Sequence, residues 1–213
     1  MAVAATPRRV GAETSKTRDA LLDCVETMML DEGYASVTYR ALATKADVTP
    51  SLVQYYFPTL DDIFLAAIQR YAERNSAVLS SALEARSEDP LHALWDFSWD
   101  EATGALMTEF MALGNHRKSI QSAIAEVTNQ VRAVEIAALA RKFGKGAQLP
   151  GELSLGAVAL LVTGIPKFLN LEGGIGVDGS HREVIKAIEN YLDSIETRSV
   201  RRKRAPARSR RRA

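Results

Sequence analysis

The chain is poor in the residues that stabilise disulfide-rich domains and metal sites. Its 213 residues include one cysteine, Cys24, and three histidines. A single cysteine excludes an internal disulfide framework and is typical of a reducing compartment. Because Cys24 lies in a helical apolar pattern, we expect a small core residue rather than a reactive thiol. His92, His116 and His181 have no ligand-like spacing to one another or to Cys24, so we expect neither a metal site nor a cofactor.

Membrane-spanning and secretory segments are also lacking. The longest apolar stretch, residues 153–165, is too short to cross a bilayer and stops at Pro166. The first residues lack the apolar core of a signal peptide, so we expect a cytoplasmic protein.

Patterns typical of strands and of enzymes are missing as well. No segment alternates apolar and polar residues as a half-buried strand does. Residues 174–179 match a dinucleotide-binding fingerprint letter by letter, but a helical pattern precedes them where a strand is required, so we predict a loop. No nucleophile with a base and no catalytic carboxylate pair can be recognised, so we expect no enzymatic activity.

The charge of the chain is divided unevenly between its body and its end. The net charge is +1, but residues 198–213 carry nine basic side chains and no acidic one, which leaves −8 on residues 1–197. Such a tail is either a solvated, disordered extension or a source of electrostatic affinity for nucleic acid.

Two short helices joined by a tight turn are predicted between residues 37 and 57. Thr38 is suited to cap the first helix and Thr49 the second, and Pro50 follows Thr49 at a position where a missing N–H costs nothing. Asp47 is expected to adopt a left-handed conformation in the turn. This pattern indicates a helix-turn-helix, which lays its second helix in the major groove of DNA.

The rest of the patterned sequence also predicts helices, and the chain is expected to be all-α with about nine of them. The further helices are predicted at about residues 14–31, 59–85, 91–102, 105–113, 117–143, 153–171 and 181–195.

The segment from Leu21 to Leu65 resembles the DNA-binding domain of the tetracycline-repressor (TetR) family of bacterial regulators. The matching residues are Thr38, Arg40, Leu42 and Ala43 in a capped helix, Ala46, Asp47, Val48 and Thr49 in the turn, Tyr55, Tyr56 and Phe57 at the aromatic end, and Thr59, Leu60 and Asp61 at the next cap. There are two departures. Asp47 replaces the glycine of the turn, and Leu60 replaces a lysine that touches a DNA phosphate in the family.

The resemblance implies a set of DNA-facing residues. They are Thr38, Arg40, Thr49, Pro50, Ser51, Gln54, Tyr55 and Tyr56. Arg40 can bind a guanine edge and Gln54 an adenine edge through two hydrogen bonds each. Hydroxyl groups suit phosphates, which fix the register. For Tyr56, core packing and DNA contact are equally open alternatives.

The resemblance also implies how the remainder is organised. We predict a flexible basic arm at 1–13 with Arg8 and Arg9, a helix-turn-helix domain at 14–58, a helical effector-binding and dimerisation domain at 59–197, and a disordered arginine-rich tail at 198–213. The last two helices are expected to pair with those of a second copy. Candidate residues for a ligand pocket are Trp95, Trp99, Met107, Phe110, Met111, His116 and Phe168, with core packing as the alternative for each.

The expected function is a homodimeric, ligand-responsive transcriptional repressor that occupies a palindromic operator and is released by a small, largely apolar effector. Two alternatives remain. One is a DNA-organising protein without sequence preference, driven by the basic tail. The other is a small-molecule sensing module without DNA binding.

Overall fold

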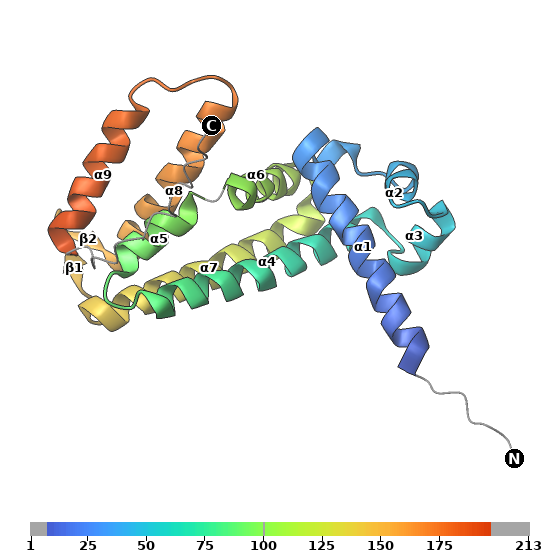
Figure 1. The fold of residues 1–213 in the computed structure, drawn as a ribbon, viewed down its shortest axis with the longest axis horizontal. Helices are drawn as coiled ribbons and strands as arrows, with labels where there is room; N and C mark the ends of the chain where they lie inside the picture. The colour runs from blue at the N-terminus through green and yellow to red at the C-terminus, as the bar shows by residue number, and fades with distance from the viewer. Residues whose placement is uncertain (1–7, 100, 197–213) are drawn as a thin grey trace, which may run out of the picture.

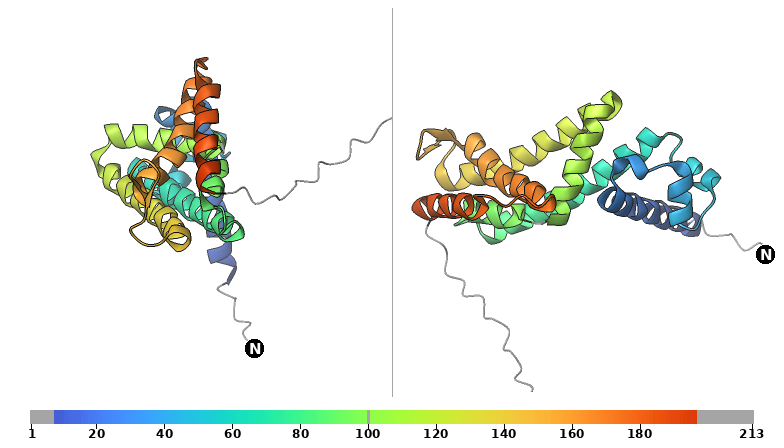
Figure 2. Two further views of the ribbon diagram at one scale, coloured as in Figure 1. Left: turned by 90° about the vertical axis from the view of Figure 1, so that its left-hand side faces the viewer. Right: turned by 90° about the horizontal axis from the view of Figure 1, so that it is seen from above.

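The computed structural model describes residues 8–99 and 101–196, and this part of the chain is almost entirely helical. Helices α1–α3 form a compact unit at one end of the molecule, and α8 and α9 lie at the other end (Figure 1). Helices α4 and α7 run side by side between the two ends (Figure 1). Seen from above, the α1–α3 unit lies at one end of the molecule and α9 at the other (Figure 2). The prediction of an all-α protein with about nine helices is confirmed for the described residues.

The bounds of the elements are α1 Arg8–Glu32, η1 Tyr34–Ser36, α2 Tyr39–Lys45, α3 Pro50–Tyr56, α4 Leu60–Ala85, α5 Pro90–Ser98, α6 Glu101–His116, α7 Lys118–Phe143, β1 Gln148–Leu149, β2 Leu153–Ser154, α8 Leu155–Gly174 and α9 His181–Ile195.

Several predicted boundaries are wrong. Helix α1 begins at Arg8 rather than at residue 14, so residues 8–13 of the predicted arm are helical, and residues 1–7 lie outside the described part. The helix predicted at 91–102 ends at Ser98, and α6 is longer than the predicted 105–113. Helix α5 is apolar on nearly every side, so the sequence shows no periodic pattern whose end would mark where the helix stops.

Two short strands, β1 and β2, were not expected. They pair antiparallel as a hairpin, with Leu149 opposite Leu153. The Tyr191 hydroxyl donates to the Pro150 carbonyl oxygen at 3.0 Å, which ties the hairpin to α9. Strands of two residues are too short to produce an alternating pattern.

Helix α8 is longer than the apolar stretch within it. It continues through Pro166 to Gly174, so by length and composition it could cross a membrane, which corrects the expectation drawn from residues 153–165. One such helix is weak evidence of a membrane span, because a core helix has the same composition. In this structure α8 packs against α5 and α7.

Two hydrophobic cores hold the helices together. The first joins α1–α4 to the facing ends of α6 and α7, and includes Leu22, Phe57, Phe64, Phe110 and Ile120. The second joins the end of α4 to α5, α7, α8 and α9, and includes Leu83, Trp95, Leu139, Val158 and Leu192. The α1–α3 unit therefore shares its core with α6 and α7.

A carboxylate far away in the sequence holds the beginning of α5. Both oxygens of Glu196 accept from the Leu91 backbone N–H, at 3.0 and 3.1 Å, and one of them also accepts from the His92 N–H. The His92 ring lies between Glu196 and Asp193, with its nitrogens 3.1 and 2.9 Å from their oxygens. The end of α9 is thereby fastened to α5.

Candidate nucleic-acid interface and ligand cavity

The helices α2 and α3 each begin with a hydrogen bond between residues that are close in the sequence. The Thr38 hydroxyl accepts from the Ala41 N–H at 3.2 Å, and the Thr49 hydroxyl accepts from the Leu52 N–H at 3.3 Å, so both predicted N-caps are confirmed. Asp47 has φ 52°, which confirms the left-handed turn without a glycine.

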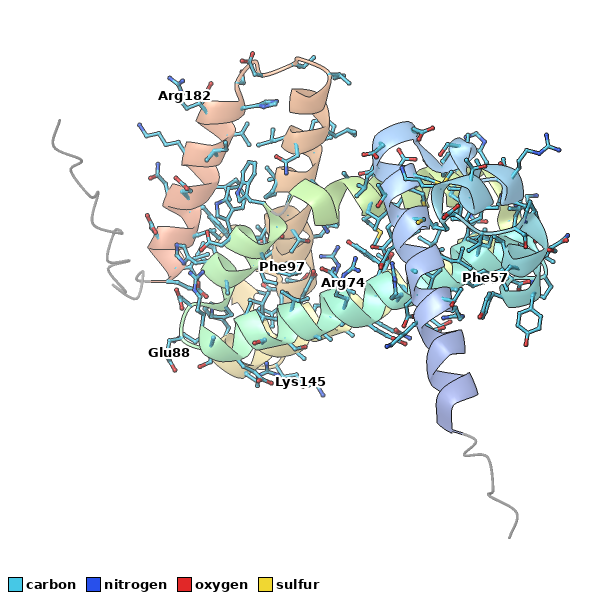
Figure 3. The ribbon with its side chains drawn as sticks, turned by 45° about the vertical axis from the view of Figure 1, so that its right-hand side comes forward. Phe57, Arg74, Glu88, Phe97, Lys145 and Arg182 are labelled. Carbon is cyan, nitrogen blue, oxygen red and sulfur yellow. The ribbon has the colours of Figure 1, made fainter. Side chains whose placement is uncertain are left out.

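The core side of the pair is fixed by buried residues. Leu42 and Val53 are fully buried, and the Tyr39 hydroxyl donates to the Phe57 carbonyl oxygen at 3.0 Å. Phe57, labelled in Figure 3 where α3 ends, is buried under the Arg18 guanidinium, which lies 5.2 Å from its ring centre. These contacts hold α3 against α1 and leave its opposite side in solvent.

The structure leaves most of the predicted DNA-facing residues of the helix pair exposed to solvent. Those that are exposed are Thr38, Arg40, Thr49, Pro50, Ser51, Gln54 and Tyr55. Tyr55 is 74% exposed, so its hydroxyl is accessible to a partner. Tyr56 is half-buried, with its ring edge-on to Tyr55 at 5.3 Å, so it lies between core and surface. DNA contact by each of these residues stays a prediction.

The exposed side carries little positive charge. Arg40 is exposed, while Lys45 lies 3.6 Å from the Asp31 carboxylate and is partly neutralised by it. Leu60, at the position of the family's phosphate-binding lysine, packs partly buried against the first core. The basic tail lies outside the described residues, as do the side chains of Arg8 and Arg9.

A cavity of about 740 Å³ lies between α6, α8 and α9. Its wall combines apolar and polar side chains, among them Trp99, Thr108, Glu109, Lys167, Asn170 and Ile185. This volume is in the range of small-molecule sites.

The predicted pocket residues do not gather around this cavity. Trp99 alone of the seven lines it. Trp95 and Phe110 are buried in the two cores, and Met107 packs against the first core. His116, Met111 and Phe168 are exposed, and His116 stacks on Tyr34. Periodicity identified apolar helix faces but not which of them surround a space.

Sequence reasoning missed the charged residues of the cavity. Lys167 stands in a mostly apolar helix, and a charge in such a segment was an available signal. Burial lowers the pKa of Lys167, and the nearby Glu135 carboxylate opposes this effect. Burial raises the pKa of Glu135, although Arg132 donates to it at 2.8 Å. Among the described residues no group of three or more histidine, cysteine or acidic side chains could hold a metal ion.

Comparison with known proteins gives both a sequence relative and structural neighbours, although no family model matches the chain. The HTH-type transcriptional repressor BepR of Brucella suis biovar 1 (strain 1330) is 28% identical over 80% of this chain and 88% of its own. A TetR transcription regulator from Haloarcula marismortui ATCC 43049 has a TM-score of 0.63 at 15% identity, covering 84% of this chain and 98% of that one. A protein described as a transcriptional regulator from Saccharomonospora viridis, solved with choline, has a TM-score of 0.68 at 13% identity, covering 85% and 95%.

The chain has the TetR-family fold. In this fold α1–α3 form the helix-turn-helix unit, and α3 is the second helix of its pair.

The TetR-family fold of this chain leaves one face of α8 uncovered. Its exposed apolar residues recur at helical spacing around Gly164, and they are Leu160, Leu161, Phe168, Leu171 and Ile175. A continuous apolar stripe of this kind is typical of a protein–protein interface.

One polar contact connects the helix-turn-helix unit to α6, and another connects the start of α4 to the start of α7. A side-chain oxygen of Glu109, a cavity residue, accepts from the Tyr34 backbone N–H at 2.8 Å. The Arg117 guanidinium donates to Asp61, at the start of α4, at 2.6 Å, and Ser119 donates to the same carboxylate. These hydrogen bonds hold the pKa of Asp61 below its usual value. Glu109 therefore lines the cavity and also holds the helix-turn-helix unit through Tyr34.

Proposed function

We propose that this protein is a ligand-responsive transcriptional repressor that binds operator DNA as a homodimer in the cytoplasm, without enzymatic activity. The observation that carries the proposal is the exposed side of the α2–α3 pair. It presents Arg40, Gln54 and Tyr55 to solvent on helices whose backs are fixed by buried residues. Guanidinium and carboxamide groups read base edges in the major groove, and a phenol suits phosphates.

The apolar stripe on α8 supports a homodimer. One recognition helix reads only a few base pairs. Two copies related by two-fold symmetry can bind the two half-sites of a palindromic operator. The stripe includes Phe168 and Leu171, which a second copy of the same helix would cover. Gly164 within it leaves room for close approach, because nothing lies within 4 Å of where its Cβ would be.

The cavity supports a response to a small molecule. Since Glu109 belongs both to the cavity wall and to the contact with Tyr34, a bound molecule that displaces Glu109 would loosen the hold of α6 on the helix-turn-helix domain. A change in the separation of two recognition helices would then release the operator.

The test is a titration of the purified protein on the intergenic DNA upstream of its own gene and on scrambled DNA, at near-physiological salt. We expect a preference of about a thousandfold or more for the native DNA. Equal, salt-sensitive binding to both would favour a DNA-organising protein, and binding to neither would favour a sensing module without DNA binding.

Two variants test which residues contact the DNA bases. Arg40→Ala and Gln54→Ala should each weaken binding to the native DNA by about tenfold to a hundredfold and leave binding to scrambled DNA nearly unchanged. Gln69→Ala, an exposed position on α4, is the matched control. Equal losses on both DNAs would assign Arg40 and Gln54 to phosphate contacts instead.

The basic tail is proposed to add affinity that the weakly charged face lacks. Deleting residues 198–213 should then reduce the dependence of DNA affinity on salt, because fewer counterions are released. An unchanged dependence would leave the tail as a solvated extension.

A further inference from the structure

The cavity between α6, α8 and α9 has a lysine and a glutamate in its wall that do not neutralise each other, while the His181 ring of the same wall lies 2.8 Å from the Glu172 carboxylate. Lys167 and Glu109 both line it, yet no ion pair joins them within 4.0 Å. The Lys167 ammonium has no hydrogen-bond acceptor among the described residues, so its charge is without a direct partner there.

Lys167 lies near one buried carboxylate, Glu135, which another cation already engages. Behind it, Arg132 donates to Glu135 at 2.8 Å and to the Thr163 hydroxyl at 3.2 Å. Glu135 is thus engaged by Arg132, and two cations share one buried carboxylate. Lys167 is half withdrawn from water and makes no ion pair with Glu109 across the cavity, so an added anion close to its ammonium would stabilise that charge.

A neighbouring residue supplies an unused donor. Asn170 follows Lys167 by three positions on α8, which places both on one side of the helix. Its Nδ2 is buried and has no hydrogen-bond partner in the described part of the chain. An unpaired buried donor is costly, so an acceptor brought by a ligand is favoured there.

The opposite wall supplies an acceptor. Glu109 accepts from the Tyr34 N–H through Oε2, whereas Oε1 has no hydrogen bond to the residues that the structure describes. Between the polar groups, Trp99, Leu169 and Ile185 give the cavity an apolar surface.

We infer that this cavity binds a small amphipathic carboxylate that also bears a hydrogen-bond donor. Its carboxylate would bind Lys167 and Asn170, its donor would bind Glu109, and its apolar part would lie against Trp99. The inference rests on the proposed function only in naming this molecule as the effector. A purely apolar molecule would leave Lys167 and Asn170 unpaired, so the expectation of a largely apolar effector is narrowed to one with a charged end.

The test uses three matched probes: 3-phenyllactate, its amide, and 3-phenylpropionate, which lacks the hydroxyl group. The two tryptophans of the chain, Trp95 and Trp99, lie 5.4 Å apart at or beside the cavity, so intrinsic fluorescence reports binding. We expect 3-phenyllactate to bind at least about tenfold more tightly than the amide, and more tightly than 3-phenylpropionate. Equal affinities, or no binding of any probe at millimolar concentration, would overturn the inference.

Variants of Lys167 separate charge from folding. Lys167→Met should weaken binding of 3-phenyllactate by about tenfold or more and leave the amide unaffected, whereas Lys167→Arg should retain most of the affinity. Lys186→Met, on the exposed side of α9, is the control and should change neither. If Lys167→Met lowers the affinity for both probes equally, the carboxylate does not bind Lys167 and the inference fails.

A DNA titration without any probe tests the proposed repressor function independently of ligand binding in the cavity. Selective DNA binding without a Lys167-dependent probe would overturn the inference alone. Lys167-dependent binding of 3-phenyllactate by a protein that ignores DNA would uphold the cavity assignment and overturn the repressor.

Discussion

The helices of the DNA-binding half and those of the C-terminal half begin in different ways. Helices α2, α3 and α4 each start with a threonine whose hydroxyl accepts from a backbone N–H three residues on: Thr38, Thr49 and Thr59. Among the later helices α8 has such a cap in Ser154, but α5, α7 and α9 have none, and α5 is held by Glu196, more than a hundred residues away. The first half is specified by neighbours in the sequence, and much of the second by partners that only the fold brings together.

This difference also predicts how each half responds to damage. A local cap stabilises its own helix and can be lost without disturbing others. Loss of a buried carboxylate from a network of several donors leaves each of those donors unsatisfied. The three changes that follow test the contrast, from the largest expected effect to the smallest.

Glu196→Ala should lower the free energy of unfolding by about 3 kcal/mol, because it leaves the Leu91 and His92 N–H groups and the His92 ring without their buried acceptor. Urea denaturation followed by circular dichroism measures this loss. Glu183→Ala, an exposed residue in the first turn of α9, should cost only a few tenths of a kcal/mol. Similar losses for the two variants would contradict the long-range cap.

Thr59→Ala should cost about 1 kcal/mol. It removes the capping box in which Thr59 accepts from the Asp62 N–H at 3.1 Å while Asp62 accepts from the Thr59 N–H at 2.8 Å. The same denaturation experiment applies, with Thr27→Ala on the exposed side of α1 as the neutral control. If Thr59→Ala lowered the free energy of unfolding as much as Glu196→Ala does, local and distant caps would not differ in their effect on stability.

Asp61→Asn should have the smallest effect, about 0.5 kcal/mol at neutral pH, because the pair with Arg117 is partly exposed. The pKa of Asp61 is lowered in the folded protein, so its stabilisation is present above the usual carboxyl pKa and lost as the pH falls through the folded value. Unfolding midpoints of the two proteins should therefore differ at pH 7 and converge in acid. A difference that is independent of pH would assign the effect to packing.

The same contrast explains which features the sequence could predict. The caps, the turn at Asp47 and the bounds of α9 follow from signals within a few residues, and all are found in the structure. The end of α5 and the hairpin depend on tertiary contacts, which no local pattern records.

The candidate sites divide in the same manner. The residues proposed for the α2–α3 surface came from the family resemblance, and the exposure of most of them agrees with the local pattern of short amphipathic helices. The cavity is formed where α6, α8 and α9 meet, so Lys167, Asn170 and Glu109 come together only in three dimensions. Of the seven pocket candidates that the family resemblance suggested, six do not line this cavity.

The hydrogen bond between the Tyr34 amide and Glu109 makes the contact between the helix-turn-helix domain and α6 measurable by hydrogen exchange. This backbone proton is held by a side chain of α6 rather than by a helix or strand of its own domain. Its exchange with deuterium therefore measures how often the helix-turn-helix domain detaches from α6, on a timescale separate from global unfolding. A molecule that competes for Glu109 would accelerate exchange at this one amide while the core of α4 stays protected, so motion between the two regions can be observed without DNA.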